Sequence, residues 1–161
     1  MIKQIDITNP KFAKDVLKVQ IPSYIVEAEL IDFYEIPPLK DTIDSLQQSG
    51  ETFYGYYISE ELSGAISIKI ENSVMDIHRL FVHPNHFRKG IAKKLLDFIQ
   101  TNGKEFETII VSTGSKNAPA INFYQKNGFA KSSDMFVDER LSLTILEKKI
   151  NKGFSKRAAF L

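Results

Sequence analysis

The sequence predicts a single-domain α/β fold, with a mixed, mostly antiparallel sheet flanked by helices on both faces. Three successive runs rich in β-branched and aromatic residues, at 53–58, 62–71 and 74–82, are separated by short polar turns, which is typical of antiparallel strands. Beyond residue 90, amphipathic and apolar segments alternate, and such alternation after an antiparallel meander favours a mixed sheet covered by helices. A chain of 161 residues is long enough to bury a core without disulfides or a structural metal.

The first 50 residues predict a strand over 2–7 and then two helices with an irregular connection. Asn9 can cap a helix, and the proline after it suits the first turn, so we expect a helix over 10–21. Residues 22–38 end in two prolines, which remove amide donors and disfavour helix in the preceding residue. We therefore expect a loop there, and a second helix near 39–49 that ends before a glycine.

The second half alternates helix and strand patterns as far as residue 148. The expected elements are a helix near 90–102, a strand at 107–113, a helix near 118–127, and strands near 129–137 and 140–148. We expect the domain to span 1–150, and 151–161 to be a solvated tail.

The composition excludes several classes of function. A net charge of +1 argues against a nucleic-acid partner, which usually meets a strongly basic surface. The sequence contains no cysteine, which excludes a thiolate zinc site and an acyl-cysteine intermediate. The start of the chain lacks the apolar region of a secretory signal, and no apolar run reaches the length of a membrane span. We therefore expect a cytoplasmic protein with no membrane partner.

A candidate anion-binding turn lies between the strand that ends at Val82 and the helix near 90–102. Gly90 stands where this helix opens, and the first turn of a helix offers unpaired amides and the positive end of the helix dipole. The turn is rich in basic residues, namely Arg88, Lys89, Lys93 and Lys94. The pattern predicts a phosphate site, with a solvated basic helix start as the alternative. It is not a P-loop, because no Gly-Lys-Ser/Thr follows.

A second segment, Asn117 to Phe129, has the residue pattern of an ordinary helix. Asn117 can cap a helix and Gly128 can end it. By itself the shared face of Phe123 and Tyr124 favours a core stripe that has a tyrosine at its rim.

Together the two segments resemble the GNAT N-acetyltransferase superfamily. The family's phosphate turn, Gln/Arg-x-x-Gly-x-Gly/Ala, is matched by residues 87–92 except at Phe87, and the later motif Asn-x-x-Ala-x-x-Phe-Tyr-x-x-x-Gly-Phe is matched in full at 117–129. The resemblance covers about residues 53–150 and implies the GNAT acyl-CoA N-acyltransferase fold. It also implies that the strands at 74–82 and 107–113 are parallel and splay apart.

The resemblance implies acetyl-CoA as the cosubstrate. Its pyrophosphate would lie on the amides of the basic turn, and its pantetheine arm would lie beside the strand, with Asn117 and Phe123 in contact. Tyr124 would face the sulfur and act as the general acid. The implied cofactor-binding residues are Leu80, Val82, Arg88, Lys89, Gly90, Ile91, Ala92, Lys93, Asn117, Phe123 and Tyr124.

The implied reaction is direct attack of a primary amine, from a small molecule or a peptide, on the thioester. A backbone amide at Leu80 or Val82 would bind the oxyanion. Asp76 and His78 are candidates to take the proton of the amine, because strand alternation would place both on the face of Leu80 and Val82. For each of them, a solvated strand residue is the alternative.

The acceptor amine and its partners are less constrained by the sequence. Glu27 and Glu29 lie in an acidic, aromatic segment, so we expect them to bind a cationic amine, with a solvated acidic face as the alternative. The three histidines lack a completing carboxylate or cysteine, so no metal site is expected. The protein is expected to be a monomer or homodimer, and a catalytically silent acyl-CoA-binding or sensing domain is the alternative to an enzyme.

Overall fold

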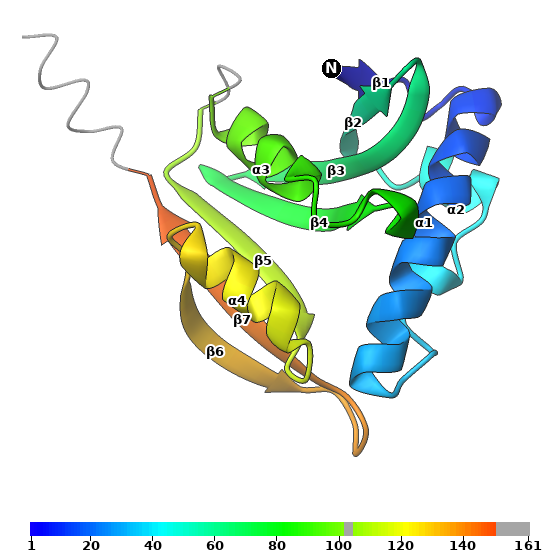
Figure 1. Ribbon diagram of the computed structural model, residues 1–161. Helices are drawn as coiled ribbons and strands as arrows, with labels where there is room; N and C mark the ends of the chain where they lie inside the picture. Colours follow the sequence, from blue (N-terminus) through cyan, green and yellow to red (C-terminus); the bar gives the residue numbers. More distant parts are fainter. Residues whose placement is uncertain (102–104, 151–161) are drawn as a thin grey trace, which may run out of the picture.

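The computed structural model describes residues 1–101 and 105–150 and contains a seven-stranded sheet in the order β1-β2-β3-β4-β5-β7-β6 (Figure 1). Neighbouring strands are antiparallel except for β4 and β5, which are parallel. The strands are β1 (Ile2–Ile5), β2 (Thr52–Ile58), β3 (Glu61–Glu71), β4 (Val74–Val82), β5 (Thr108–Gly114), β6 (Ala130–Phe136) and β7 (Ser142–Lys149). The predicted mixed, mostly antiparallel sheet is confirmed, whereas the expected tail at 151–161 lies outside the described residues.

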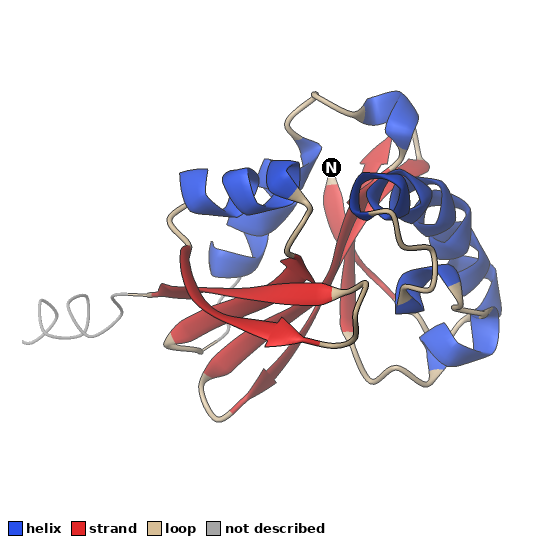
Figure 2. Cartoon of the chain, turned by 90° about the horizontal axis from the view of Figure 1, so that it is seen from below, coloured by secondary structure: helices blue, strands red, loops and turns tan. Residues whose placement is uncertain are grey.

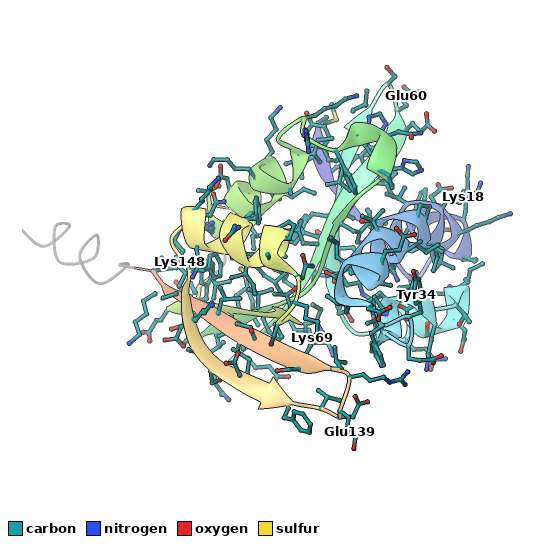
Figure 3. All side chains as sticks on the ribbon, turned by 60° about the horizontal axis from the view of Figure 1, so that its bottom comes forward. Lys18, Tyr34, Glu60, Lys69, Glu139 and Lys148 are labelled. Carbon is teal, nitrogen blue, oxygen red and sulfur yellow. The ribbon has the colours of Figure 1, made fainter. Side chains whose placement is uncertain are left out.

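Helices cover both faces of the sheet, as predicted (Figure 2). The α-helices are α1 (Pro10–Ile31), α2 (Ile43–Gln47), α3 (Ile91–Thr101) and α4 (Ala118–Lys126), and short 3-10 turns form η1 (Pro37–Leu39) and η2 (Pro84–His86). One core packs α3 and α4 against the sheet, and a second core packs α1 and α2 against the other face. Charged side chains such as those of Lys18, Glu60 and Glu139 point outward (Figure 3).

Helix α1 continues ten residues beyond the predicted end at 21, through Pro22. A proline inside a helix costs about 3 kcal/mol. The helix bears that cost because Tyr24, Ala28 and Ile31 continue the buried stripe of its first half into the core, and each large apolar side chain contributes about 1.5–3 kcal/mol when fully buried. The expectation that residues 22–38 are irregular is therefore wrong for their first ten residues.

The predicted helix over 39–49 is also shorter than expected. Its start is the 3-10 turn η1, and α2 has only five residues. A capping box sets the beginning of α2, because the side chains of Thr42 and Ser45 each accept from the other's backbone amide. The other predicted helices and strands agree with the structure to within about two residues at each end.

No helix in the described part of the chain is long and apolar enough to span a membrane. Two apolar cores, one on each side of the sheet, hold the helices against the strands.

Candidate active site

The sheet opens between its two parallel strands. The pairing of β4 with β5 runs from Val74 opposite Thr108 to Ile77 opposite Val111 and goes no further. Toward their carboxyl ends the two strands diverge, and the C-terminal half of α1 lies at the open end (Figure 1). The predicted splay is therefore present, and it leaves the last part of β4 with a free edge.

A bulge in β4 lies at the point where the strands separate. The register of β4 against β3 skips His78, between Ile77 and Arg79. Ile77 belongs to the core beneath α3 and α4, and Leu80 and Val82 contact or belong to the same core. Before the bulge the odd-numbered residues of β4 face this core, and after the bulge the even-numbered residues face it. The extra residue reverses the alternation.

This bulge overturns the expectation that Asp76 and His78 share a face with Leu80 and Val82. Asp76 lines neither of the two cavities described below. Nε2 of His78 lies 3.6 Å from Oδ2 of Asp76, and its Nδ1 lies 3.7 Å from Oε2 of Glu51. Burial raises the pKa of Asp76, His78 opposes this change, and the charge of Glu51 adds to it.

A first cavity of about 520 Å³ lies along the free edge of β4, between the starts of α3 and α4. Of the predicted cofactor-binding residues, it is lined by Leu80, Val82, Arg88, Gly90, Ile91, Ala92, Lys93, Phe123 and Tyr124. Lys89 is not among its lining residues; its Nζ lies 2.9 Å from Nδ1 of His86. Ser23 also lines it, and the sequence analysis missed this residue because it ended α1 too early.

The backbone at Gly90 leaves room for a ligand atom to come close to it. Its φ is +76°, and a Cβ built there would meet nothing within 4 Å, so the space beside the backbone is open. The carbonyl of Gly90 accepts the first helical hydrogen bond of α3, from the amide of Lys94 at 3.1 Å. The amides before Lys94 have no carbonyl partner within α3, and the positive end of the helix dipole lies at the same end. This geometry fits a pyrophosphate.

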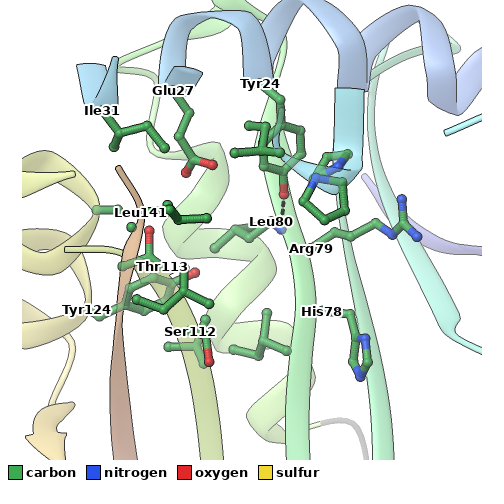
Figure 4. Close-up of a pocket in the computed structure, with 18 of the residues that line it drawn as sticks. Tyr24, Glu27, Ile31, His78, Arg79, Leu80, Ser112, Thr113, Tyr124 and Leu141 are labelled. Atoms are coloured by element: carbon green, nitrogen blue, oxygen red, sulfur yellow. Dashed lines mark hydrogen bonds between the residues drawn. The ribbon is translucent and has the colours of Figure 1, made fainter. Parts of the chain in front are cut away.

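A second cavity, of about 500 Å³, lies on the other side of the gap between β4 and β5 (Figure 4). Side chains from α1, η1, β4, β5 and the β6–β7 connection surround it. Three residues line both cavities, namely Leu80, Ala120 and Tyr124. The two cavities therefore meet beside the Tyr124 side chain, which is buried.

Tyr24 and Glu27 bring polar groups from α1 into the second cavity. The amide of Leu80 donates a 3.4 Å hydrogen bond to the Tyr24 hydroxyl (Figure 4). Oε1 of Glu27 accepts a 2.8 Å hydrogen bond from the side-chain amide of Asn117. Burial raises the pKa of Glu27, although the hydrogen bond from Asn117 counteracts this change.

The two tyrosines in the second cavity are held in their neutral form. Burial raises the pKa of Tyr24 and of Tyr124, and the nearby charge of Glu27 adds to both shifts. Their hydroxyl groups therefore remain hydrogen-bond donors across the whole pH range in which proteins usually work.

The structure separates Glu27 from Glu29 and reassigns Asn117. Glu29 is exposed and lines neither cavity, because residues two apart on a helix point in nearly opposite directions.

Asn117 is buried and also lines neither cavity. Its Oδ1 caps α4 by accepting from the amide of Ala120 at 3.2 Å, while its Nδ2 holds Glu27. In this structure the Asn117 side chain thus contacts α1 and the first turn of α4, and its contact with a pantetheine arm stays a prediction.

A partly buried ionic network, which the sequence did not predict, forms one wall of the second cavity. Arg79 Nε donates to Glu51 at 2.8 Å, and Nη1 donates to Asp41 and to Gln20. Although burial disfavours its charge, the hydrogen bonds from Arg79 and Ser67 hold the pKa of Glu51 below its ordinary value. The charge of Arg79 is therefore already engaged by Glu51 and Asp41 and does not balance that of Glu27.

The three histidines do not assemble a metal site. His83 Nδ1 accepts from the amide of Asn85 at 3.1 Å, so it organises the turn before α3. Among the described residues, no group of three or more histidine, aspartate or glutamate side chains is placed to hold a metal ion.

Comparison with known proteins agrees with the geometry. Residues 15–129 match the model of the acetyltransferase (GNAT) family. Over 145 residues the chain is 37% identical to the UPF0157 protein YqkA of Bacillus subtilis (strain 168), covering 90% of this chain and 42% of that protein. It is 32% identical over 97 residues to a streptothricin acetyltransferase of Escherichia coli, covering 58% of this chain and 56% of that protein. The chain thus spans about half the length of these two relatives.

Among solved structures, the PaiA N-acetyltransferase of Thermoplasma acidophilum, in complex with coenzyme A, has the same fold. It superposes with a TM-score of 0.71 at 21% identity, over 93% of this chain and 98% of that one.

Proposed function

Because this chain belongs to the acetyltransferase (GNAT) family, we propose that it transfers an acetyl group from acetyl-CoA directly to a primary amine of a small molecule or peptide. The observation that carries the proposal is the meeting of two cavities at Leu80 and Tyr124. A direct transfer needs a site where donor and acceptor enter from different sides and their reacting atoms come together. The cavities on the two sides of the β4–β5 gap meet that requirement.

The cosubstrate fits the first cavity. The amides at the start of α3 and the side chains of Arg88 and Lys93 would hold the pyrophosphate, since helix N-termini bind phosphate groups. The free edge of β4 at Leu80 and Val82 would pair with the pantetheine arm as an added strand does. When bound, acetyl-CoA supplies an activated acyl group with a thiolate leaving group.

Two groups of this chain would stabilise the reaction. The amide of Leu80 donates a long 3.4 Å hydrogen bond to Tyr24, which can be exchanged for a shorter, charge-assisted bond to an oxyanion. Tyr124 would protonate the departing sulfur. Its raised pKa makes it a weaker acid than an exposed tyrosine, but it ensures that the proton is present at every pH of an assay.

The acceptor would enter the second cavity, whose lining joins apolar side chains to three carboxylates, those of Glu27, Asp41 and Glu51. Since Arg79 is engaged by two of these carboxylates, the cavity suits a cationic amine with an apolar portion better than an anionic acceptor.

The test is release of free CoA thiol when the protein is mixed with acetyl-CoA and an amine. A suitable panel contains spermidine, phenethylamine, and peptides with an N-terminal alanine or an internal lysine. We expect thiol release above the rate without amine, together with the acetylated amine in the mass spectrum. Binding of acetyl-CoA without turnover of any amine would contradict the enzymatic proposal and favour an acyl-CoA-binding or sensing domain.

A further inference from the structure

We propose that Glu27, positioned by Asn117, is the group that takes the proton from the acceptor's ammonium before attack. This inference rests on the proposed acetyl transfer and assigns its general base. It moves that role from β4, where sequence alternation placed it, to α1.

The position of Glu27 carries the proposal. Its side chain enters the second cavity from α1 and lies on the side of β4 that faces Leu80 and Tyr124 (Figure 4). Asn117 binds Oε1 at 2.8 Å, and no hydrogen bond to Oε2 from the described residues is present. One oxygen is therefore held in place, and the other is available to an amine that approaches the junction of the two cavities.

The surrounding charges also single out Glu27. The titratable and charged groups that share its cavity are Tyr24, Asp41, Glu51, His78, Arg79 and Tyr124. The two tyrosines are neutral, and Arg79 is engaged by Glu51 and Asp41. Within the described part of the chain, Glu27 is the carboxylate of this cavity that is not held by a cation.

Burial supports the same role. It raises the pKa of Glu27, which makes the carboxylate more basic and brings it closer to the pH at which a general base works best. The hydrogen bond from Asn117 opposes this shift and keeps the charged form accessible.

The residues first considered for this role are less well placed. Asp76 lines neither cavity. His78 lines the second cavity, but its ring extends from the opposite side of β4 to Leu80 and Tyr124 (Figure 4), and its Nδ1 lies 3.7 Å from Oε2 of Glu51.

The proton balance of the step is complete. Glu27 accepts one proton from the ammonium, and the neutral nitrogen then forms a bond to the thioester carbon. When the carbon–sulfur bond breaks, the thiolate receives a proton from Tyr124, which is reprotonated by the second proton that leaves the nitrogen. Glu27 returns its proton to solvent, so the products are the acetamide, CoA thiol and one proton.

The experiment compares Glu27→Gln with Glu29→Gln, a matched control two residues away on the exposed side of α1. With the best amine of the panel, we expect kcat of Glu27→Gln to fall by about 10²–10⁴-fold, the usual contribution of a positioned base. Glu29→Gln should retain the wild-type kcat. Acetyl-CoA dissociation constants, measured by calorimetry, should stay within about threefold of wild type in both variants, which checks that each is folded.

The pH profile separates a base from a residue that merely attracts the ammonium. In the wild type, kcat/KM should fall at low pH as Glu27 becomes protonated. In Glu27→Gln the plateau above this limb should be lost, and kcat/KM should keep rising tenfold per pH unit up to the pKa of the free amine, about 10.4 for an alkylamine. Glu27→Asp should recover part of kcat.

Two outcomes would overturn the inference. A raised KM with unchanged kcat and an unchanged pH profile in Glu27→Gln would reduce Glu27 to an ion-pair partner. Wild-type kinetics in that variant would remove it from the reaction. Both outcomes are distinct from failure of the proposed function, in which the wild-type protein itself acetylates no amine.

Discussion

The side-chain amide of Asn117 donates a 2.8 Å hydrogen bond to Glu27, a residue 90 positions earlier in the chain. This bond links the start of α4 to the C-terminal half of α1 across the gap between β4 and β5. The same Asn117 caps α4 through its Oδ1. One buried side chain thus sets both the beginning of the helix that carries Tyr124 and the orientation of the carboxylate of Glu27 in the second cavity.

Substitution of Asn117 should therefore destabilise the protein. Asn117→Ala removes a helix cap and a hydrogen bond to a charged group, so we expect the free energy of unfolding to fall by about 2–3 kcal/mol in urea denaturation at pH 7. Asn117→Asp keeps the cap acceptor but places a second carboxylate beside Glu27. Asn117→Asp should lose more stability at pH 7 than at pH 5. If Asn117→Asp had the stability of the wild type at pH 7, the bond to Glu27 would contribute nothing.

Gly90→Ala should weaken acetyl-CoA binding by about tenfold or more, because the methyl group enters the space that the ligand needs and each charge-assisted hydrogen bond lost is worth about 1.5–3 kcal/mol. Alanine is also strained at a φ of +76°, by about 1–2 kcal/mol. Gly50→Ala is the matched control, since Gly50 has a φ of +72° and does not line the first cavity.

The measurement is the melting temperature with and without acetyl-CoA. The wild type should gain about 2.7 kcal/mol at a hundredfold excess over the dissociation constant. Gly50→Ala should show the same gain from a lower starting stability, whereas Gly90→Ala should gain much less at the same concentration. An equal gain in both variants would remove the phosphate site from this turn.

Tyr124→Phe tests the proton donor. The ring stays and most packing is kept, so we expect kcat to fall by about 10²–10⁴-fold, the contribution of a positioned acid, with acetyl-CoA affinity changed less than about threefold. Since the pKa of Tyr124 is raised, wild-type kcat should show no loss up to pH 9 that is due to this hydroxyl. Tyr34→Phe, at an exposed tyrosine, is the control. A wild-type kcat in Tyr124→Phe, with chemistry rate-limiting, would assign the proton to water or another group.

Arg79→Met should cost up to about 3–5 kcal/mol at pH 7, because it leaves the partly buried carboxylates of Glu51 and Asp41 without their cation. The pKa of Glu51 is depressed in the folded wild type, so its stabilisation is fully present above the unfolded value of about 4.3 and is lost as the pH falls through the folded pKa. The deficit of Arg79→Met should therefore shrink below about pH 4, where the carboxylates become protonated.

Unfolding free energies of wild type and Arg79→Met between pH 3 and pH 7 measure this effect. Lys93→Met, which removes an exposed pair with Asp97, should change stability by less than about 1 kcal/mol at every pH. A deficit for Arg79→Met that does not vary with pH would mean that lost packing, and not unpaired charge, causes it.

The sequence alone determined the features that depend on near neighbours. The turn at Gly90, the cap at Asn117 and the three antiparallel strands were predicted correctly, because each follows from backbone preferences and side-chain patterns within a few residues. Two such local motifs were sufficient to indicate the family and the first cavity.

Only the tertiary structure decided what depends on contacts between distant segments. Local rules end α1 before Pro22, but burial of Tyr24, Ala28 and Ile31 against the sheet extends the helix and carries Glu27 to the site. Likewise, period-two alternation cannot reveal the bulge at His78, which exists in the pairing of β4 with β3. The physical reason is the same in both cases: the free energy gained from packing against residues far along the chain exceeds the local preference, and a local pattern contains no information about those partners.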